Sequence, residues 1–208
     1  MLYFIYVSLS MQDIQTIIQI LSSGKPVIYP TDTVYGLWCD AANDVAVENL
    51  YTLTSRPEHK GLIVLCDSLN MIEKYGEIRF ELEKRIIEHC MPWPLTLILD
   101  SRHELSALVE QPNGTLWVRI PDHDIALDII TAFGRPIATK SANRSGMVAP
   151  TDVNEIDPYF IDHWVMIIDG GICDIQIPST IIRVIDEDDF QILRQGSMSE
   201  DEIRELIA

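Results

Sequence analysis

Side chains that could carry chemistry gather in short polar segments that follow apolar runs. The first is the segment 30–37 (PTDTVYGL), which brings two threonine hydroxyls, a carboxylate and a phenol directly after an apolar run. Ligands of α/β proteins usually bind beyond the carboxyl ends of strands. The segment is therefore a candidate ligand-binding loop, although a turn that caps the next helix accounts for the same residues equally well.

A second segment, 55–61 (SRPEHKG), places Arg56, His59 and Lys60 within five positions before another apolar run. A guanidinium binds phosphate or carboxylate through two parallel hydrogen bonds. The spacing therefore indicates an anion-binding loop. The simpler interpretation is a solvated connection between a helix and a strand.

Arg119 ends the apolar run 116–118. Burying an unpaired guanidinium is costly, so its partner should be either a structural carboxylate or an anionic ligand. The segment 139–146 (TKSANRSG) is rich in hydroxyls and cations, and its backbone N–H groups could form an anion-binding nest. A Ser/Asn-rich turn is the alternative. The segments 178–180 (PST) and 194–196 (RQG) are weaker signals of the same kind.

Other chemistries lack their signatures in this sequence. It contains no GxxxxGK[ST], GxSxG, HExxH or GxGxxG motif. The five histidines are scattered, and the four tryptophans are too dispersed for a base-stacking surface. The four cysteines form no closely spaced pair, which favours buried free thiols over a zinc site.

Elements that position these segments follow from apolar periodicity. Helical spacing predicts helices over 12–22, 43–54, 78–90 and 124–133, and the capping pair Ser199 and Glu202 predicts a last one. Apolar runs predict strands over 26–29, 61–66, 95–99, 116–120, 136–139, 164–168, 180–185 and 190–193. The last two are spaced as a hairpin and should pair antiparallel. We therefore expect one α/β domain with a twisted, mixed parallel/antiparallel sheet flanked by helices.

Size and charge narrow the possibilities. The 208 residues suit one domain, and 15 basic against 32 acidic residues leave a net charge of −17. That charge opposes extended contact with nucleic acid but still permits small anionic ligands held by a local arginine cluster. Residues 1–10 are too short to span a bilayer and lack a basic leader, so they are either a first strand or a start-site extension. We expect a cytoplasmic protein without membrane contact.

Seven motifs in one order give the chain a specific resemblance. They are PTDTVYGL (30–37), SRPEHKGLIVL (55–65), PLTLIL (94–99), VRIPDH (118–123), SANRSG (141–146), PST (178–180) and LRQG (193–196). Together they resemble the YrdC/TsaC family over roughly residues 11–198, within a single domain covering 1–208. The resemblance implies a central ligand cavity in the sheet. It also implies synthesis of L-threonylcarbamoyladenylate from L-threonine, bicarbonate and ATP, with release of pyrophosphate, for tRNA modification.

Site roles follow from the same resemblance. It implies a catalytic set of Arg56, Lys60, Thr33 and Ser141; ATP binding by Arg56, Lys60, Ser141, Asn143 and Arg194; and threonine binding by Thr31, Thr33, Tyr35, Arg119 and Ser179. Mg²⁺ would bind through the phosphates of ATP, and Asp32 is a candidate protein contact by its charge alone. The chain ends soon after Arg194, which indicates the short form of the synthase. Its partners would be separate threonylcarbamoyl-transferase proteins, with tRNA as a further candidate.

Two positions depart from the family pattern. The usual Lys-x-Arg reads Thr54-Ser55-Arg56, and the usual Trp-Pro-Gly-Pro reads Met91-Pro92-Trp93-Pro94. Losing a charged hydrogen bond to phosphate costs roughly 1.5–3 kcal/mol, and Lys140 is our candidate for the replacement ammonium. The alternative functions are a non-synthase paralogue like YciO, which binds nucleotides or double-stranded RNA, and an interaction protein that only keeps the fold.

Overall fold

The computed structural model describes residues 10–55 and 61–208. Its helices are α1 (Met11–Ser22), α2 (Asp44–Thr54), α3 (Leu69–Tyr75), α4 (Glu81–Cys90), α5 (Asp124–Phe133), α6 (Pro158–Asp162) and α7 (Glu200–Leu206), with a 3-10 turn at Val153–Glu155. Its strands are β1 (Val27–Pro30), β2 (Tyr35–Asp40), β3 (Ile63–Leu65), β4 (Gly76–Glu77), β5 (Leu95–Ser101), β6 (Thr115–Arg119), β7 (Ile137–Ser141), β8 (Met166–Ile167), β9 (Thr180–Val184) and β10 (Phe190–Arg194).

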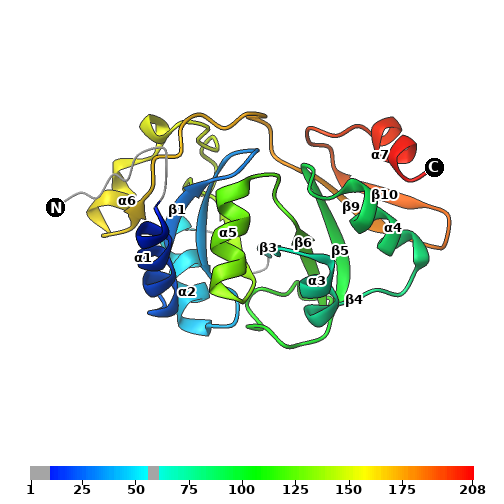
Figure 1. Ribbon diagram of the computed structural model, residues 1–208, viewed down its shortest axis with the longest axis horizontal. Helices are drawn as coiled ribbons and strands as arrows, with labels where there is room; N and C mark the ends of the chain where they lie inside the picture. The colour runs from blue at the N-terminus through cyan, green and yellow to red at the C-terminus, as the bar shows by residue number, and fades with distance from the viewer. Residues whose placement is uncertain (1–9, 56–60) are drawn as a thin grey trace.

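The strands form one mixed sheet in the order β10-β9-β5-β6-β3-β7-β2-β1-β8, with β4 paired to β5 (Figure 1). The pairs β3–β6, β5–β9 and β1–β8 are parallel, and the others are antiparallel. β9 and β10 form the expected antiparallel hairpin. The predicted α/β fold with a mixed sheet is therefore confirmed.

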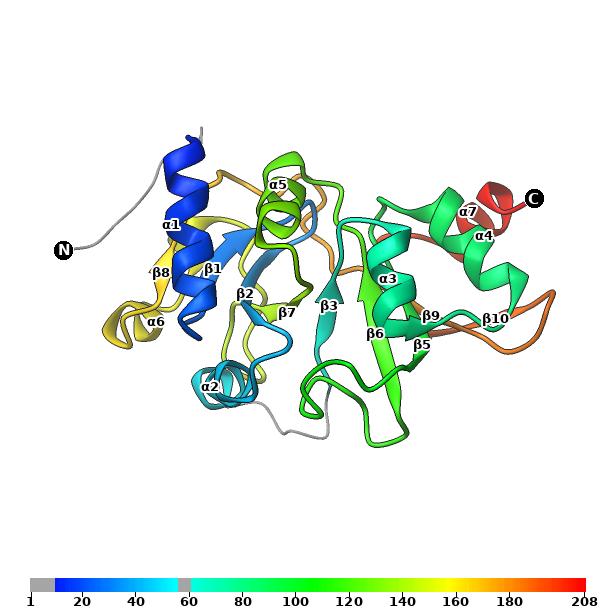
Figure 2. The same ribbon diagram turned by 60° about the horizontal axis from the view of Figure 1, so that its bottom comes forward.

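Helices cover both faces of the sheet. Figure 2 shows α1 and α5 on one face and α2 on the opposite face. Ile17 and Leu21 of α1 pack with Ile130 of α5, whereas Val47 and Leu50 of α2 belong to the larger core on the other side. The amphipathic spacing seen in the sequence thus buries the apolar side of each helix against the sheet.

Capping residues set several helix ends where the sequence places them. Asn43 caps α2 through a bond from the Ala46 N–H, and Ser199 forms the expected capping box with Glu202. Gly134 ends α5 in the left-handed conformation, with φ 70°. α4 begins at Glu81 rather than at residue 78, because the Glu83 carboxylate accepts from the N–H groups of Arg79 and Phe80, at 2.7 and 3.1 Å.

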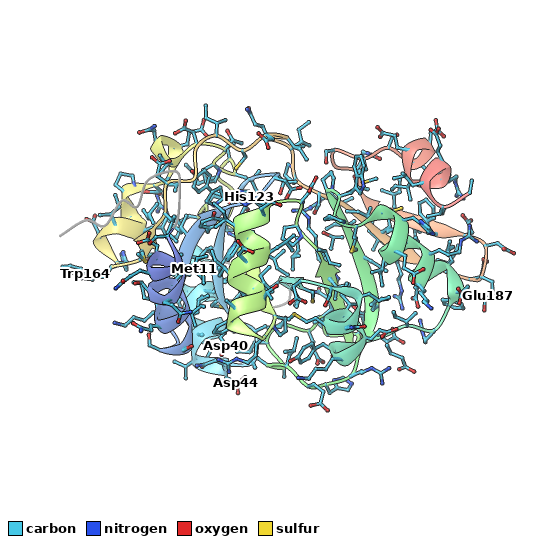
Figure 3. All side chains as sticks on the ribbon, in the orientation of Figure 1. Met11, Asp40, Asp44, His123, Trp164 and Glu187 are labelled. Atoms are coloured by element: carbon cyan, nitrogen blue, oxygen red, sulfur yellow. The ribbon has the colours of Figure 1, made fainter. Side chains whose placement is uncertain are left out.

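The crossover segment, residues 169–178, joins the two sides of the sheet. It leaves β8 at one edge and reaches β9, which lies beyond the centre of the strand order. Figure 1 shows it in orange, running along the upper edge of the sheet. Figure 3 shows His123 near the same edge, at the start of α5, and Glu187 at the tip of the β9–β10 hairpin. This single segment therefore passes over the strands that carry the candidate site.

The cysteines are free and buried, as expected, at positions 39, 66, 90 and 173. Within residues 10–55 and 61–208, none of the helices has the length and apolar character needed to cross a membrane. Residues 1–9, expected to be a first strand or an extension, lie outside the described residues.

Candidate functional site

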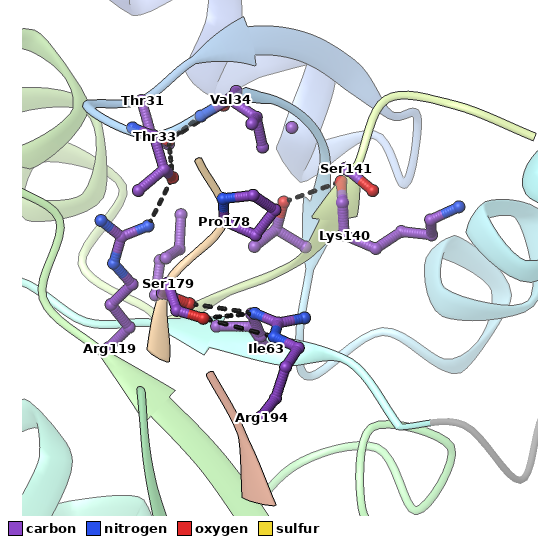
Figure 4. Close-up of a pocket in the computed structure, with 13 residues that line it drawn as sticks. Thr31, Thr33, Val34, Ile63, Arg119, Lys140, Ser141, Pro178, Ser179 and Arg194 are labelled. Carbon is purple, nitrogen blue, oxygen red and sulfur yellow. Dashed lines mark hydrogen bonds between the residues drawn. The ribbon is translucent and has the colours of Figure 1, made fainter. Parts of the chain in front are cut away.

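A cavity of about 100 Å³ opens at the middle of the sheet, where the polar segments converge (Figure 4). Six of the predicted site residues line it: Thr31, Thr33, Arg119, Ser141, Ser179 and Arg194. Val34, Gly36, Ile63, Leu65, Thr139, Lys140 and Pro178 complete the lining. Segments from five strands and two loops thus meet in one place, as the sequence analysis expected.

Strand direction gives this cavity two ends. β3 runs parallel to β6, and Leu65 pairs with Arg119. On its other side β3 runs antiparallel to β7, and there Leu65 pairs with Ile137. Ser141 therefore lies about 13 Å from the level of Arg119 along the strands, at about 3.3 Å per residue. One end of the cavity is marked by Arg119 and the other by Ser141.

The Arg119 end combines a buried ion pair with two hydroxyls. Arg119 Nη2 donates to Asp32 Oδ2, and Nη1 donates to Thr33 Oγ1 at 2.8 Å. Thr31 Oγ1 shares a 2.9 Å hydrogen bond with Thr33 Oγ1. Arg119 and Asp32 are 3% and 4% exposed. The structural carboxylate expected for Arg119 is therefore Asp32, and Arg119 also lines the cavity, where a contact with an anionic ligand stays a prediction.

Burial lowers the pKa of Arg119, and the Asp32 carboxylate opposes that shift. Two polar atoms of this pair lack a hydrogen-bond partner among the described residues, namely Arg119 Nε and Asp32 Oδ1. An unpaired buried donor is costly, so the Arg119 end is prepared to accept a polar ligand.

Ser179 and Arg194 form the third corner of the cavity. Arg194 donates to the Ser179 carbonyl from Nη2 at 2.7 Å and from Nε at 3.3 Å. Ser179 Oγ in turn shares a 2.8 Å hydrogen bond with Thr96 Oγ1. A Cβ at Gly196 would lie 2.3 Å from the Pro178 carbonyl, so the turn after β10 requires glycine to approach this corner.

At the Ser141 end the loop 141–146 is fixed by its neighbours. Lys140 Nζ donates to the Asn143 carbonyl at 2.6 Å. The Ala142 N–H donates to the Tyr35 carbonyl and the Ser145 N–H to the Thr54 carbonyl, both at 2.8 Å. β2 and the end of α2 therefore hold this loop in place. Lys140 is among the lining residues, but it alternates with Thr139 and Ser141 on β7 and its side chain extends away from the cavity in Figure 4, so the replacement ammonium stays a hypothesis.

Asn143 faces a second, adjoining cavity of about 340 Å³ rather than the first. Its other lining residues are Ala142, Arg144, Met147, Val148, Ala149, Pro150, Glu155 and Asp157. The Asn143 amide donates to the Met147 carbonyl at 2.6 Å, and Asn143 Oδ1 is buried without a hydrogen-bond partner in the described part of the chain. The loop 141–146 thus separates two neighbouring spaces.

Tyr35 does not line either cavity. Side chains alternate across a strand, so Gly36 faces the cavity and Tyr35 points to the other face of β2. Its hydroxyl donates to the Gly171 carbonyl at 2.6 Å and accepts from the Gly170 N–H at 3.3 Å. Burial raises the pKa of the Tyr35 phenol above its ordinary range. Tyr35 therefore contacts the crossover segment instead of the predicted threonine end.

Thr54 and Trp93 do not line the cavity, and two other residues singled out in the sequence fall outside the described part of the chain. Arg56 and Lys60 lie outside the described residues. Thr54 is fully buried, and its hydroxyl donates to the Leu50 carbonyl within α2 at 2.8 Å. Trp93 is 48% exposed and is not a cavity residue. Thr54 thus satisfies its polar group inside its own helix.

Sequence reasoning assigned no site role to several wall residues, chiefly Ile63, Leu65 and Thr139, although Thr139 lies in the candidate segment 139–146. Thr139 lies two positions before Ser141 on β7, so strand alternation places both on the cavity face. The spacing of two residues from Ser141 is therefore the sequence signal that could have identified Thr139 as a wall residue. Ile63 and Leu65 belong to an apolar run, which carries no sign of facing a ligand.

His123 closes the start of α5 near Asp32. Its Nδ1 accepts from the Ala126 N–H at 3.3 Å, and its ring meets Tyr29 edge-on at 5.5 Å between centroids. Burial lowers the pKa of His123, against the opposing pull of Asp32. A neutral ring is required for this cap, because a protonated Nδ1 cannot accept.

The cavity offers hydroxyls and cations rather than carboxylates. Within residues 10–55 and 61–208, no group of three His, Cys, Asp or Glu side chains could hold a metal ion. Asp32 lies in sequence between the lining residues Thr31 and Thr33, and its carboxylate forms an ion pair with Arg119. These donors suit phosphate and carboxylate oxygens.

Comparison with known proteins identifies relatives over most of the chain. The Sua5/YciO/YrdC family model, described as telomere recombination, matches residues 19–196. A threonylcarbamoyl-AMP synthase of Vibrio vulnificus is 31% identical over 88% of this chain and 98% of its own length. A threonylcarbamoyl-AMP synthase of Pyrococcus abyssi is 33% identical over 90% of this chain but only 55% of its own length.

Solved structures agree with that relationship. The structure of P. abyssi Sua5 complexed with L-threonine superposes with a TM-score of 0.92 at 31% identity, covering 99% of this chain and 61% of that one. Escherichia coli YciO superposes with a TM-score of 0.82 at 23% identity, covering 98% of this chain and 100% of that one, and shows the shared fold. This chain spans about three fifths of the Sua5 protein.

Proposed function

This chain belongs to the Sua5/YciO/YrdC family, and from that membership we propose that it forms L-threonylcarbamoyladenylate from L-threonine, bicarbonate and ATP, releasing pyrophosphate. The observation that carries the proposal is the two-ended cavity. Its Arg119 end suits an amino acid, and its Ser141 end, together with the corner at Arg194, suits a polyphosphate.

The threonine carboxylate would bind at the Arg119 end. A guanidinium carries five N–H donors, and the bonds to Thr33 and Asp32 engage two of its nitrogens, so Arg119 retains donors for a carboxylate. Thr31, Thr33 and Ser179 add hydroxyls for the threonine side chain and carbamate. A related Sua5 binds L-threonine, which supports this assignment.

ATP would occupy the Ser141 end. Its phosphates would meet Ser141 and Arg194, with Arg56 and Lys60 added from the sequence pattern. The adjoining 340 Å³ cavity beside Asn143 has room for the nucleoside. Mg²⁺ would arrive bound to the triphosphate and would neutralise part of its charge.

The reaction needs no protein nucleophile. The threonine amine attacks carbon dioxide formed from bicarbonate and loses a proton to become a carbamate. A carbamate oxygen then attacks the α-phosphorus of ATP, and the bond to pyrophosphate breaks. The chain's contribution is to hold both reactants in line and to neutralise charge on the phosphates, the role we assign to Arg56, Lys60, Thr33 and Ser141.

Threonine-dependent release of pyrophosphate is the direct test. Purified protein is assayed with ATP, Mg²⁺ and bicarbonate, with and without L-threonine, beside Arg56→Ala. Release that requires threonine and is lost in the variant supports the synthase. ATP binding without such release would instead support the non-synthase paralogue, for which Thr54 in place of lysine is the favouring observation.

The product would pass to separate threonylcarbamoyl-transferase proteins in the cytoplasm. A net charge of −17 disfavours extended contact with the tRNA backbone, so transfer of a small product between proteins suits this chain better than direct tRNA binding.

A further inference from the structure

The crossover segment (residues 169–178) ends in the cavity wall. Pro178, its last residue, and Ser179 both line the cavity, and in Figure 4 they lie between Arg119 and Arg194. The position of the threonine end therefore depends on where this segment lies. No regular secondary structure joins residue 168 to residue 179.

Contacts with residues 30–35, which form the corner between β1 and β2, hold the first half of the segment. The Tyr35 hydroxyl bonds the Gly171 carbonyl and the Gly170 N–H, at 2.6 and 3.3 Å. The Ile175 N–H donates to the Asp32 carbonyl at 2.9 Å. A Cβ at Gly170 would lie 2.4 Å from Pro30 Cγ, so the backbone at Gly170 packs closely against the Pro30 ring.

Among the residues that contact the crossover segment, Tyr35 also bonds the chain beside the second cavity, where we place the nucleoside. Its backbone N–H donates to the Pro150 carbonyl at 2.9 Å, and its carbonyl accepts from the Ala142 N–H at 2.8 Å. The backbone of Tyr35 thus fixes the loop beside the second cavity, while its side chain fixes the crossover segment. The two functions are chemically separable, because removing the hydroxyl leaves the backbone bonds intact.

We propose that Tyr35 is a positioning residue whose hydroxyl ties the crossover segment to the sheet and thereby sets the threonine end of the cavity. It acts from the far face of β2 and touches no substrate. This inference rests on the proposed function and differs from the family-implied role, in which Tyr35 would contact threonine.

The test is Tyr35→Phe, which deletes one oxygen and keeps the buried ring. The matched control is Tyr51→Phe, because the Tyr51 hydroxyl also donates to a loop carbonyl, that of Leu108 at 2.9 Å. Hydrogen exchange without substrates should show about tenfold faster exchange across 169–178 in Tyr35→Phe, since both hydrogen bonds of the hydroxyl are lost and their net contribution is on the order of 1 kcal/mol. Tyr51→Phe should leave exchange of this segment unchanged.

Kinetics separate positioning from contact. In Tyr35→Phe we expect the KM for L-threonine to rise three- to tenfold, while the KM for ATP and kcat stay within twofold. A raised threonine KM with unchanged exchange would overturn the proposal in favour of direct contact. Faster exchange with an unchanged threonine KM would overturn it as well. If the wild-type protein shows no threonine-dependent release, the proposed function fails, and the exchange comparison still decides whether Tyr35 ties the segment.

Discussion

Arg119 and Asp32 form an ion pair that is buried in the wall of the cavity, with Thr33 bonded to the same guanidinium. The cost of removing two charges from water is offset by their mutual attraction only while both are present. Removing one partner therefore leaves the other charge buried and uncompensated. The pair therefore links the stability of the fold to the shape of the threonine end.

Asp32→Asn should destabilise the protein by about 3–5 kcal/mol, the usual cost of leaving a buried charge without its partner. Urea unfolding measures the change. The control is Asp100→Asn, whose partner Arg79 is 41% exposed, and this change should stay within about 1 kcal/mol. Equal effects of the two variants would contradict a stabilising role for the buried pair.

Arg194→Ala should lower threonine-dependent pyrophosphate release about ten- to a hundredfold, because a charge-assisted hydrogen bond contributes roughly 1.5–3 kcal/mol. Steady-state release of pyrophosphate is the measurement. Arg183→Ala is matched to it, since Arg183 lies on the neighbouring strand and pairs with Asp100 outside the cavity. A loss of the same size in both variants would show that the effect is not specific to the cavity.

If Lys140 supplies the replacement cation, Lys140→Met should raise the KM for ATP about tenfold or more, because it removes the charge while keeping an apolar chain of similar length. Lys84→Met, at an exposed position paired with Glu88, is the control and should not change it. An unaltered KM for ATP in Lys140→Met would refute Lys140 as the replacement for the cation missing at position 54.

His123 should make folding stability depend on pH. Its pKa is lowered by burial, so between that value and the ordinary 6.5 the unfolded chain binds more protons than the folded one. Stability is then full above about pH 6.5 and declines as pH falls toward the lowered pKa.

Thermal melts from pH 7.5 to 5 would measure this decline. His123→Asn keeps a capping side chain and should flatten the dependence, whereas His89→Asn, at an exposed position, should not. A wild-type slope retained in His123→Asn would contradict the assignment.

The α/β class and most elements followed from periodicity, because the helices are amphipathic and the strands are buried apolar runs. β2 was not predicted, because its six residues, Tyr35–Asp40, are buried on both faces and begin within a segment rich in turn-forming residues. A fully buried strand shows no alternation of polar and apolar side chains, so its period was hidden. α3 was missed as well, since seven residues are too few for a clear helical repeat.

The cavity residues could be foreseen as a set but not in their orientation. Thr31, Thr33 and Tyr35 belong to one motif, yet only the two threonines line the cavity. The distinction depends on the pairing of Gly36 with Ser141, which fixes which face each β2 residue presents. The ion pair between Arg119 and Asp32 could not be foreseen either, because it depends on how β6 lies in space relative to the β1–β2 corner.

The parallel pair of β1 and β8 has a consequence for synthesis of the chain on the ribosome. Val27 is made early but pairs with Met166, and Leu95 pairs with Thr180, so both parallel contacts wait until most of the polypeptide has emerged. Contacts between residues so distant in sequence slow folding. Until Met166 appears, β1 presents an unpaired strand edge, and a nascent chain stalled before that point is the form most exposed to aggregation.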